Sequence, residues 1–126
     1  YRSPCQSSNE FQVFLKRLES IIESICTPSN SDLVIMIGDF NAKLSLWNPN
    51  DADSVEGIEL HTMTSSYGLT QIISEATHIL PNSSSCIDLL FTNQRNMVTK
   101  SGVLPSLHPA CHFDRADKED ILSSSI

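Results

Sequence analysis

An aspartate and an asparagine two residues apart are the side chains of this sequence best suited to chemistry. They occur in Gly38-Asp39-Phe40-Asn41, directly after the apolar run Leu33–Ile37. A carboxylate at Asp39 can take a proton from water, and the Asn41 amide can donate a hydrogen bond to a phosphate oxygen. The spacing therefore predicts hydrolytic phosphoryl-transfer chemistry at the end of a strand. The alternative is that Gly-Asp here forms only a turn.

A second carboxylate, Asp88, lies within the apolar segment Cys86–Thr92, which has the composition of a strand. Because the burial of an unpaired carboxylate is costly, this side chain needs either solvent or a partner. Two interpretations stay open. Asp88 either faces solvent on an edge strand or caps a neighbouring turn, or it orients a catalytic histidine as the acid of a catalytic triad does.

Two imidazoles and a thiol lie close together near the carboxyl end, at His108, Cys111 and His112. Such side chains can bind zinc, but no second cluster with ligand spacing occurs in the sequence. A zinc site is therefore the less favoured interpretation. His61 and His78 have no motif around them, and we interpret both as surface residues.

The elements that position these residues begin with an amphipathic helix. Apolar residues recur at spacings of three and four over residues 9–26, and Ser7 and Glu10 form a capping box before them. A segment rich in turn residues then leads into Leu33–Ile37. These apolar, mostly β-branched residues indicate a fully covered strand of a layered α/β or α+β sheet.

Beyond Asn41 we expect a polar loop over residues 45–55. Trp47 in this loop either stacks on a nucleic-acid base or, as we favour, packs in the core. A second helix is predicted from about Glu56 to Gly68, where glycine ends it. Short strands are predicted at Leu69–Ile73, Cys86–Thr92 and Val98–Leu104.

Composition bounds the class of protein. A length of 126 residues allows one domain, and a net charge of -7 opposes nonspecific binding to nucleic acid. The sequence shows no long apolar run and no apolar leader, so we expect neither a membrane segment nor secretion. Four cysteines without a Cys-x-x-Cys pair favour a reducing, intracellular location, in the nucleus or cytoplasm. The sequon at Asn82 is interpreted as an exposed turn.

Taken in order, these motifs resemble those of the endonuclease/exonuclease/phosphatase family. The most similar members are the apurinic-like endonuclease domains of non-LTR (LINE-type) retrotransposons. The resemblance rests on Tyr1-Arg2-Ser3-Pro4, Gly38-Asp39-Phe40-Asn41 and Cys86-Ile87-Asp88-Leu89. It implies a four-layer α/β sandwich and Mg²⁺-dependent nicking of DNA, in a parent polyprotein that also contains a reverse transcriptase domain.

The same resemblance implies a role for each matching residue. Tyr1 contacts the scissile phosphate, Asp39 activates water and Asn41 holds the phosphate. Asp88 aligns the catalytic histidine, for which His112 is the candidate.

The chain departs from the family pattern near its carboxyl end. Where the family has Ser-Asp-His, this sequence has Cys111-His112-Phe113. If His112 takes the histidine position, Cys111 replaces a metal-binding aspartate. If His112 takes the aspartate position, Phe113 replaces the histidine.

The family's amino-terminal half, which carries the main metal-binding glutamate, precedes the position that Tyr1 matches. We therefore expect this chain to be a carboxy-terminal fragment of such a domain, without the main Mg²⁺ ligand. Residues 1–113 are expected to belong to the domain and residues 114–126 to form a divergent, disordered tail. We expect the isolated chain to be inactive.

Two other functions stay open. A calcineurin-like metallophosphatase also uses Gly-Asp after a strand, but it needs a Gly-Asn-His motif that this sequence lacks. A non-catalytic module would instead bind another protein by strand addition at an exposed sheet edge. In that case Asp39→Ala would change little apart from stability.

Overall fold

The first helix begins where its cap residue predicts. In the computed structural model, which describes residues 1–3 and 5–104, helix α1 spans Ser8–Ile25. The hydroxyl of Ser7 accepts a hydrogen bond from the backbone N–H of Glu10 at 3.2 Å. This bond satisfies one of the donors that the first turn of a helix leaves free.

The second helix, α2, spans Val55–Ser66 and is capped in the same way by Ser54. It ends at Tyr67, and Gly68 follows with φ +74°, a left-handed conformation that glycine adopts without strain. Both helices therefore agree with the sequence prediction.

The main sheet has three strands in the order β1-β5-β2. Strands β1 (Ile35–Asp39) and β2 (Thr70–Gln71) both pair antiparallel with β5 (Asp88–Thr92). Every residue of the central strand β5 is buried, whereas the residues of the outer strand β1 are half-buried. Asp88 therefore begins the central strand of the sheet.

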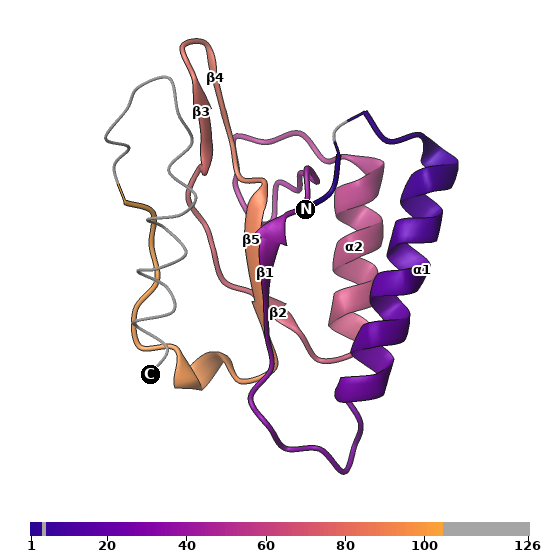
Figure 1. Ribbon diagram of the computed structural model, residues 1–126. Coiled ribbons are helices and arrows are strands. Elements are labelled where there is room, and N and C mark those ends of the chain that lie inside the picture. The colour runs from indigo at the N-terminus through magenta and orange to yellow at the C-terminus, as the bar shows by residue number, and fades with distance from the viewer. Residues whose placement is uncertain (4, 105–126) are drawn as a thin grey trace.

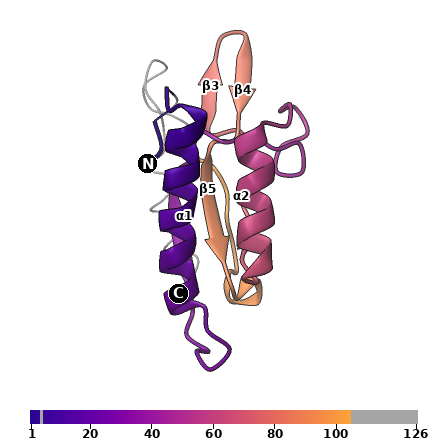
Figure 2. The ribbon, with the colours of Figure 1, turned by 90° about the vertical axis from the view of Figure 1, so that its right-hand side faces the viewer.

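Both helices cover the same face of this sheet, as Figures 1 and 2 show. Between the layers, the ring of Phe91 lies edge-on to Phe40 and to Trp47, with centroids 5.6 Å and 6.0 Å away. Edge-to-face contacts of this kind favour close packing of aromatic rings. Trp47 is buried, so the interpretation of Trp47 as a core residue is confirmed.

The two faces of the sheet have different neighbours. Phe91 faces the helices, and Asp88 lies three residues earlier on the same strand. Because successive side chains of a strand alternate, Asp88 faces away from the helices.

A short hairpin extends beyond the main sheet (Figure 1). It consists of β3 (His78–Leu80) and β4 (Ser83–Ser85), which pair antiparallel around a turn at Pro81 and Asn82. The sequence predicted the exposed turn but not the strands, because three consecutive serines have no apolar alternation.

Several predicted elements need correction. The strand expected at Leu33–Ile37 is shifted by two residues, and it is half-buried rather than fully covered because it lies at the edge of the sheet. No strand forms over 98–104; the 3-10 helix Arg95–Met97 precedes a segment whose polar middle breaks the apolar pattern. His61 and His78 are each half-buried. Within the described residues, no helix has the length and apolarity needed to cross a membrane.

Candidate active site

Two carboxylates lie opposite each other where β1 ends and β5 begins. Asp39 pairs with Asp88 across the two antiparallel strands. The backbone N–H of Phe40 donates to the carbonyl of Ile87 at 2.9 Å, which makes Asp39 and Asp88 a non-hydrogen-bonded pair. In such pairs the Cα atoms are only about 4.5 Å apart and both side chains are on the same face. The structure thus brings together two carboxylates that are far apart in the sequence.

The burial of Asp88 excludes one of its two interpretations. Asp88 is 4% exposed and belongs to the central strand, so the interpretation that it faces solvent on an edge strand is wrong. Asp39 is half-buried. The two carboxyl groups therefore lie next to each other on the face of the sheet that points away from the helices.

Asn41 turns back toward this pair. Its φ of 46° is in the left-handed region, which asparagine tolerates better than most residues. The Asp39 carboxylate accepts a hydrogen bond from the Asn41 backbone N–H at 3.1 Å, and the Asn41 side-chain amide donates to the carbonyl of Arg2. Asp39 and Asn41 therefore lie close together where β1 ends, as their spacing predicted. We call this part of the structure the corner.

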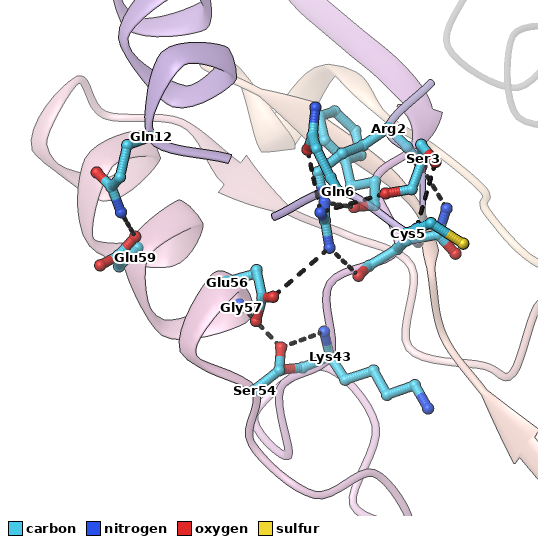
Figure 3. Close-up of polar contacts among 12 residues, drawn as sticks. Arg2, Ser3, Cys5, Gln6, Gln12, Lys43, Ser54, Glu56, Gly57 and Glu59 are labelled. Atoms are coloured by element: carbon cyan, nitrogen blue, oxygen red, sulfur yellow. Dashed lines mark hydrogen bonds and ion pairs between the residues drawn. The ribbon is translucent and has the colours of Figure 1, made fainter. Parts of the chain in front are cut away.

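Arg2 holds this corner together, a role that sequence reasoning missed. It is 3% exposed, and its Nε and Nη2 donate to the carbonyls of Phe40 and Asn41, both at 2.7 Å. Nη1 donates to Gln6 at 3.1 Å, and Nη2 lies 3.9 Å from a carboxylate oxygen of Glu56 (Figure 3). No acidic residue lies near Arg2 in the sequence, so no spacing could have indicated these contacts.

Tyr1 lies at the same corner because the backbone of Arg2 is bonded to β1. The Arg2 N–H donates to the Asp39 carbonyl at 2.8 Å, and the Tyr1 nitrogen lies 3.8 Å from the position that a Cβ on Gly38 would occupy. Tyr1 is 83% exposed. The structure therefore gathers Tyr1, Asp39, Asn41 and Asp88, whereas His112 lies outside the described residues.

The backbone beyond Asn41 is fixed by the start of α2. The Ser54 hydroxyl accepts from the N–H groups of Lys43 and Gly57, each at 3.0 Å (Figure 3). A Cβ added at Gly57 would lie 2.0 Å from the Lys43 carbonyl oxygen, so only glycine fits at this contact. The helix cap thus also anchors the chain that leaves the site.

The backbone of residues 86–88 is held by two buried polar residues that the sequence analysis did not single out. The Thr77 hydroxyl accepts from the backbone N–H groups of Ile87 and Asp88 at 3.1 Å and 2.9 Å. The Asp51 carboxylate accepts from the backbone N–H of Cys86 at 3.0 Å. Both acceptors lie in irregular segments, where a sequence pattern carries little information about long-range contacts.

Replacing Thr77 with valine is expected to lower the free energy of unfolding by about 2 kcal/mol, because two buried N–H groups lose their acceptor. The shape of the side chain is nearly unchanged, so the loss reports the hydroxyl. Urea denaturation measures it, and Thr70→Val, at an exposed position of β2, is the matched control. Equal stability of the two variants would contradict the role of Thr77.

Asp53 closes the polar loop. Its carboxylate accepts from the Ser45 N–H at 2.7 Å, and this bond, with a second from the Ser45 side chain, holds the pKa of Asp53 below its ordinary value of 3.8. A carboxyl whose folded pKa is depressed stabilises the fold above its unfolded pKa and loses this contribution as pH falls through the folded pKa. The stabilisation by Asp53 is therefore expected to be complete above pH 3.8 and to disappear at lower pH.

An NMR titration of the Asp53 carboxyl carbon checks this expectation. The midpoint should lie below 3.8. In Ser45→Ala it should move only part of the way back, since the backbone N–H, the larger cause, remains. A midpoint at or above the ordinary value would contradict the loop closure.

The described side chains supply only part of a magnesium site. Asp39 and Asp88 offer carboxylates, the ligands that Mg²⁺ prefers, but two carboxylates leave most of its octahedral shell to other groups. Within residues 1–3 and 5–104, no group of three or more His, Cys, Asp or Glu side chains could hold a metal ion. By themselves these residues do not fit a complete Mg²⁺ site. The residues of the zinc alternative, His108, Cys111 and His112, lie outside the described part.

Comparisons with known proteins identify the family and the fold. The sequence model of a family described as endonuclease-reverse transcriptase matches residues 1–113. Among solved structures, the chain is similar to the endonuclease domain of TRAS1, a telomere-specific non-LTR retrotransposon. The TM-score is 0.67 at 21% identity, and the match covers 89% of this chain and 49% of that one.

The chain thus spans about half the length of the solved structure that it matches. No curated protein matches it. The structural likeness confirms the mixed α/β fold that the motifs predicted. Because the family match covers most of the sequence, this chain belongs to the endonuclease-reverse transcriptase family.

Proposed function

We propose that this chain is part of the endonuclease domain of a non-LTR retrotransposon, and that the complete domain nicks DNA in a Mg²⁺-dependent reaction. The observation that carries the proposal is the pairing of Asp39 with Asp88 beside Asn41, with Tyr1 held next to them. A carboxylate that activates water, next to donors for a phosphate, is what phosphodiester hydrolysis needs.

Each side chain at the corner has a proposed task. Asp39 takes the proton of the attacking water. One N–H of the Asn41 amide is engaged by the Arg2 carbonyl, and the second N–H of the same group donates to a phosphate oxygen. Tyr1, whose side chain is exposed, contacts the scissile phosphate.

Asp88 is proposed to orient the catalytic histidine, with His112 as the candidate. Mg²⁺ dependence belongs to the proposal, with most of the metal ligands supplied by other parts of the domain. Residues 1–113 are taken as the contribution of this chain to the domain, and residues 114–126 as a divergent tail.

The isolated chain is proposed to be inactive. Its net charge of -7 repels the DNA backbone, so affinity for DNA must come from elsewhere in the domain. The proposed setting is an intracellular polyprotein that also contains a reverse transcriptase domain, as the description of the family suggests.

Nicking of supercoiled plasmid tests the proposal. The chain alone is compared with a joined protein, in which the amino-terminal half of an active family member precedes Tyr1, each with Mg²⁺ and with EDTA. Only the joined protein with Mg²⁺ should convert supercoiled plasmid to the open circle.

Two other outcomes of the nicking assay would contradict parts of the proposal. Nicking by the chain alone would show that the expected inactivity is wrong. A joined protein that folds but does not nick at all would overturn the endonuclease proposal and leave the non-catalytic alternative.

A further inference from the structure

The backbone of Lys43, which comes shortly after Asn41 in the chain, is fixed on both sides. Its N–H donates to the Ser54 hydroxyl at 3.0 Å, and its carbonyl accepts from the Ser54 N–H at 2.9 Å. The same carbonyl lies against Gly57, where an added Cβ would be 2.0 Å from the oxygen. The start of α2 therefore determines where the side chain of Lys43 leaves the backbone.

The side chain of Lys43 extends into solvent. Its neighbours Ala42 and Leu44 are buried, whereas Lys43 is exposed. Figure 3 shows the Lys43 side chain extending away from Ser54 and Glu56 at the start of α2. The ammonium group is therefore accessible to a molecule that approaches from the side away from α2.

The ammonium group of Lys43 is not paired with a carboxylate in the described part of the chain. Within residues 1–3 and 5–104, the ion pair that forms is that between Arg2 and Glu56. Asp53, in the loop that follows Lys43, accepts instead from the N–H of Ser45. The positive charge of Lys43 is thus available to a ligand.

The other described basic residues are not placed to serve the corner. Arg2 is buried, and its guanidinium donates to backbone carbonyls. The remaining ones lie on α1 or follow β5, at the end of the sheet opposite to Asp88; they are Lys16, Arg17, Arg95 and Lys100. Lys43 is therefore the basic side chain best placed to meet a substrate at the corner.

A phosphate that approaches the corner meets two carboxyl groups, those of Asp39 and Asp88, on a chain whose net charge is -7. Both carboxyl groups face away from the helices, which is also the direction in which the Lys43 side chain leaves α2. Because charges interact most strongly at short range, one nearby ammonium group offsets the repulsion locally. The charge of Lys43 is thus located where DNA binding needs it.

The spacing of Lys43 and Asn41 suits two different phosphates. Their Cα atoms are at most about 7 Å apart, because each residue adds at most about 3.6 Å to the length of a chain. Successive phosphates of one DNA strand are separated by about 3.4 Å of helix rise. The Asn41 amide is held at the Arg2 carbonyl, whereas the Lys43 side chain extends freely. A phosphate next to the one at Asn41 is therefore within reach of Lys43.

We propose that Lys43 forms a second phosphate subsite, which binds the DNA backbone phosphate next to the scissile one. The inference rests on the proposed function, because it assigns a further substrate contact to the same corner. A lysine ammonium acts as a point charge on a flexible stem, which suits the positioning of a backbone rather than the reading of its bases. Lys43 therefore holds DNA and takes no part in proton transfer.

The salt dependence of DNA binding by the joined protein tests this subsite without any need for catalysis. Fluorescence anisotropy of a short labelled duplex is measured with EDTA, between about 50 and 200 mM salt. Lys43→Gln should weaken binding about fivefold at the lowest salt and make the slope of log K against log[salt] shallower by about 0.9. Lys43→Arg, which keeps the charge, should keep the slope.

The nicking assay with Mg²⁺ gives a second readout. A contact that is made equally before and during the reaction affects KM and leaves kcat unchanged. In Lys43→Gln, KM for plasmid should rise about fivefold at low salt, with kcat within about twofold of the wild-type value. A loss confined to kcat would contradict a role in holding DNA.

Lys16→Gln is the matched control, because it makes the same change of charge at an exposed position of α1. It should preserve the slope. Both variants should unfold at the wild-type urea concentration, since substitutions of exposed side chains change stability little. A lower urea midpoint of Lys43→Gln with an unchanged slope would indicate a structural role instead and overturn the subsite.

The outcomes separate this inference from the proposed function. An unchanged slope in Lys43→Gln, or an equal change in Lys16→Gln, would overturn the subsite even if the joined protein nicks plasmid. A slope that falls only in Lys43→Gln would support the subsite even if the joined protein does not nick. Failure of the joined protein to bind DNA at all would overturn both.

Discussion

Replacing Arg2 with alanine is expected to lower the free energy of unfolding by about 3 kcal/mol and Tm by about 10 °C. The guanidinium is 3% exposed, and its removal leaves the carbonyls of Phe40 and Asn41 without donors at 2.7 Å. It also removes the contact with the Phe11 ring and the charge that faces Glu56. Urea denaturation followed by the fluorescence of the buried Trp47 measures the change.

Two further variants separate the causes. Arg2→Lys keeps the positive charge but has one nitrogen in place of a planar fork, so it should recover less than half of the loss. Arg17→Ala, at an exposed position of α1, should change stability by less than about 0.5 kcal/mol. If Arg2→Ala unfolds at the wild-type urea concentration, residues 1–3 are not anchored at β1.

Replacing Asp39 with asparagine is expected to slow plasmid nicking by the joined protein by about 10³-fold, because an amide cannot take the proton of the attacking water. The fold should be retained. The asparagine oxygen can still accept from the Asn41 N–H, and the amide has nearly the same size as the carboxylate that it replaces. The rate and the urea midpoint are measured on the same preparation.

Asp32→Asn is the matched control, because Asp32 is exposed before β1 and takes no part in the corner. It should nick at the wild-type rate. Nicking by Asp39→Asn at that rate would show that Asp39 is not the base. A collapse of the urea midpoint in Asp39→Asn would indicate a structural role instead.

The parts of the fold that depend on neighbouring residues could be predicted. The apolar spacing and the serine cap of α1, and the glycine after α2, are local signals, and both helices form where these signals predict. The resemblance also rested on short segments, and the family match over residues 1–113 confirms it. The spacing of Asp39 and Asn41 indicated a shared corner because only one residue separates them in the chain.

The predictions failed where packing outweighs local pattern. Residues 98–104, which are apolar at both ends, were expected to form a strand, but the described chain has none there, since a strand also needs a partner edge. The serines of β4 form a strand without apolar alternation because they pair with β3. Composition alone could not distinguish these two segments.

By itself, the sequence determined the helices, the family and the identity of the two carboxylates and the amide on which the proposed chemistry depends. Only the tertiary structure decided that Asp39 faces Asp88, that a buried Arg2 holds the corner, and that Thr77 and Asp51 support β5. The periodicity and the capping residues of a helix depend on contacts within one or two helical turns. Cross-strand pairs and buried hydrogen bonds join residues tens of positions apart, and their partners are set by the path of the folded chain.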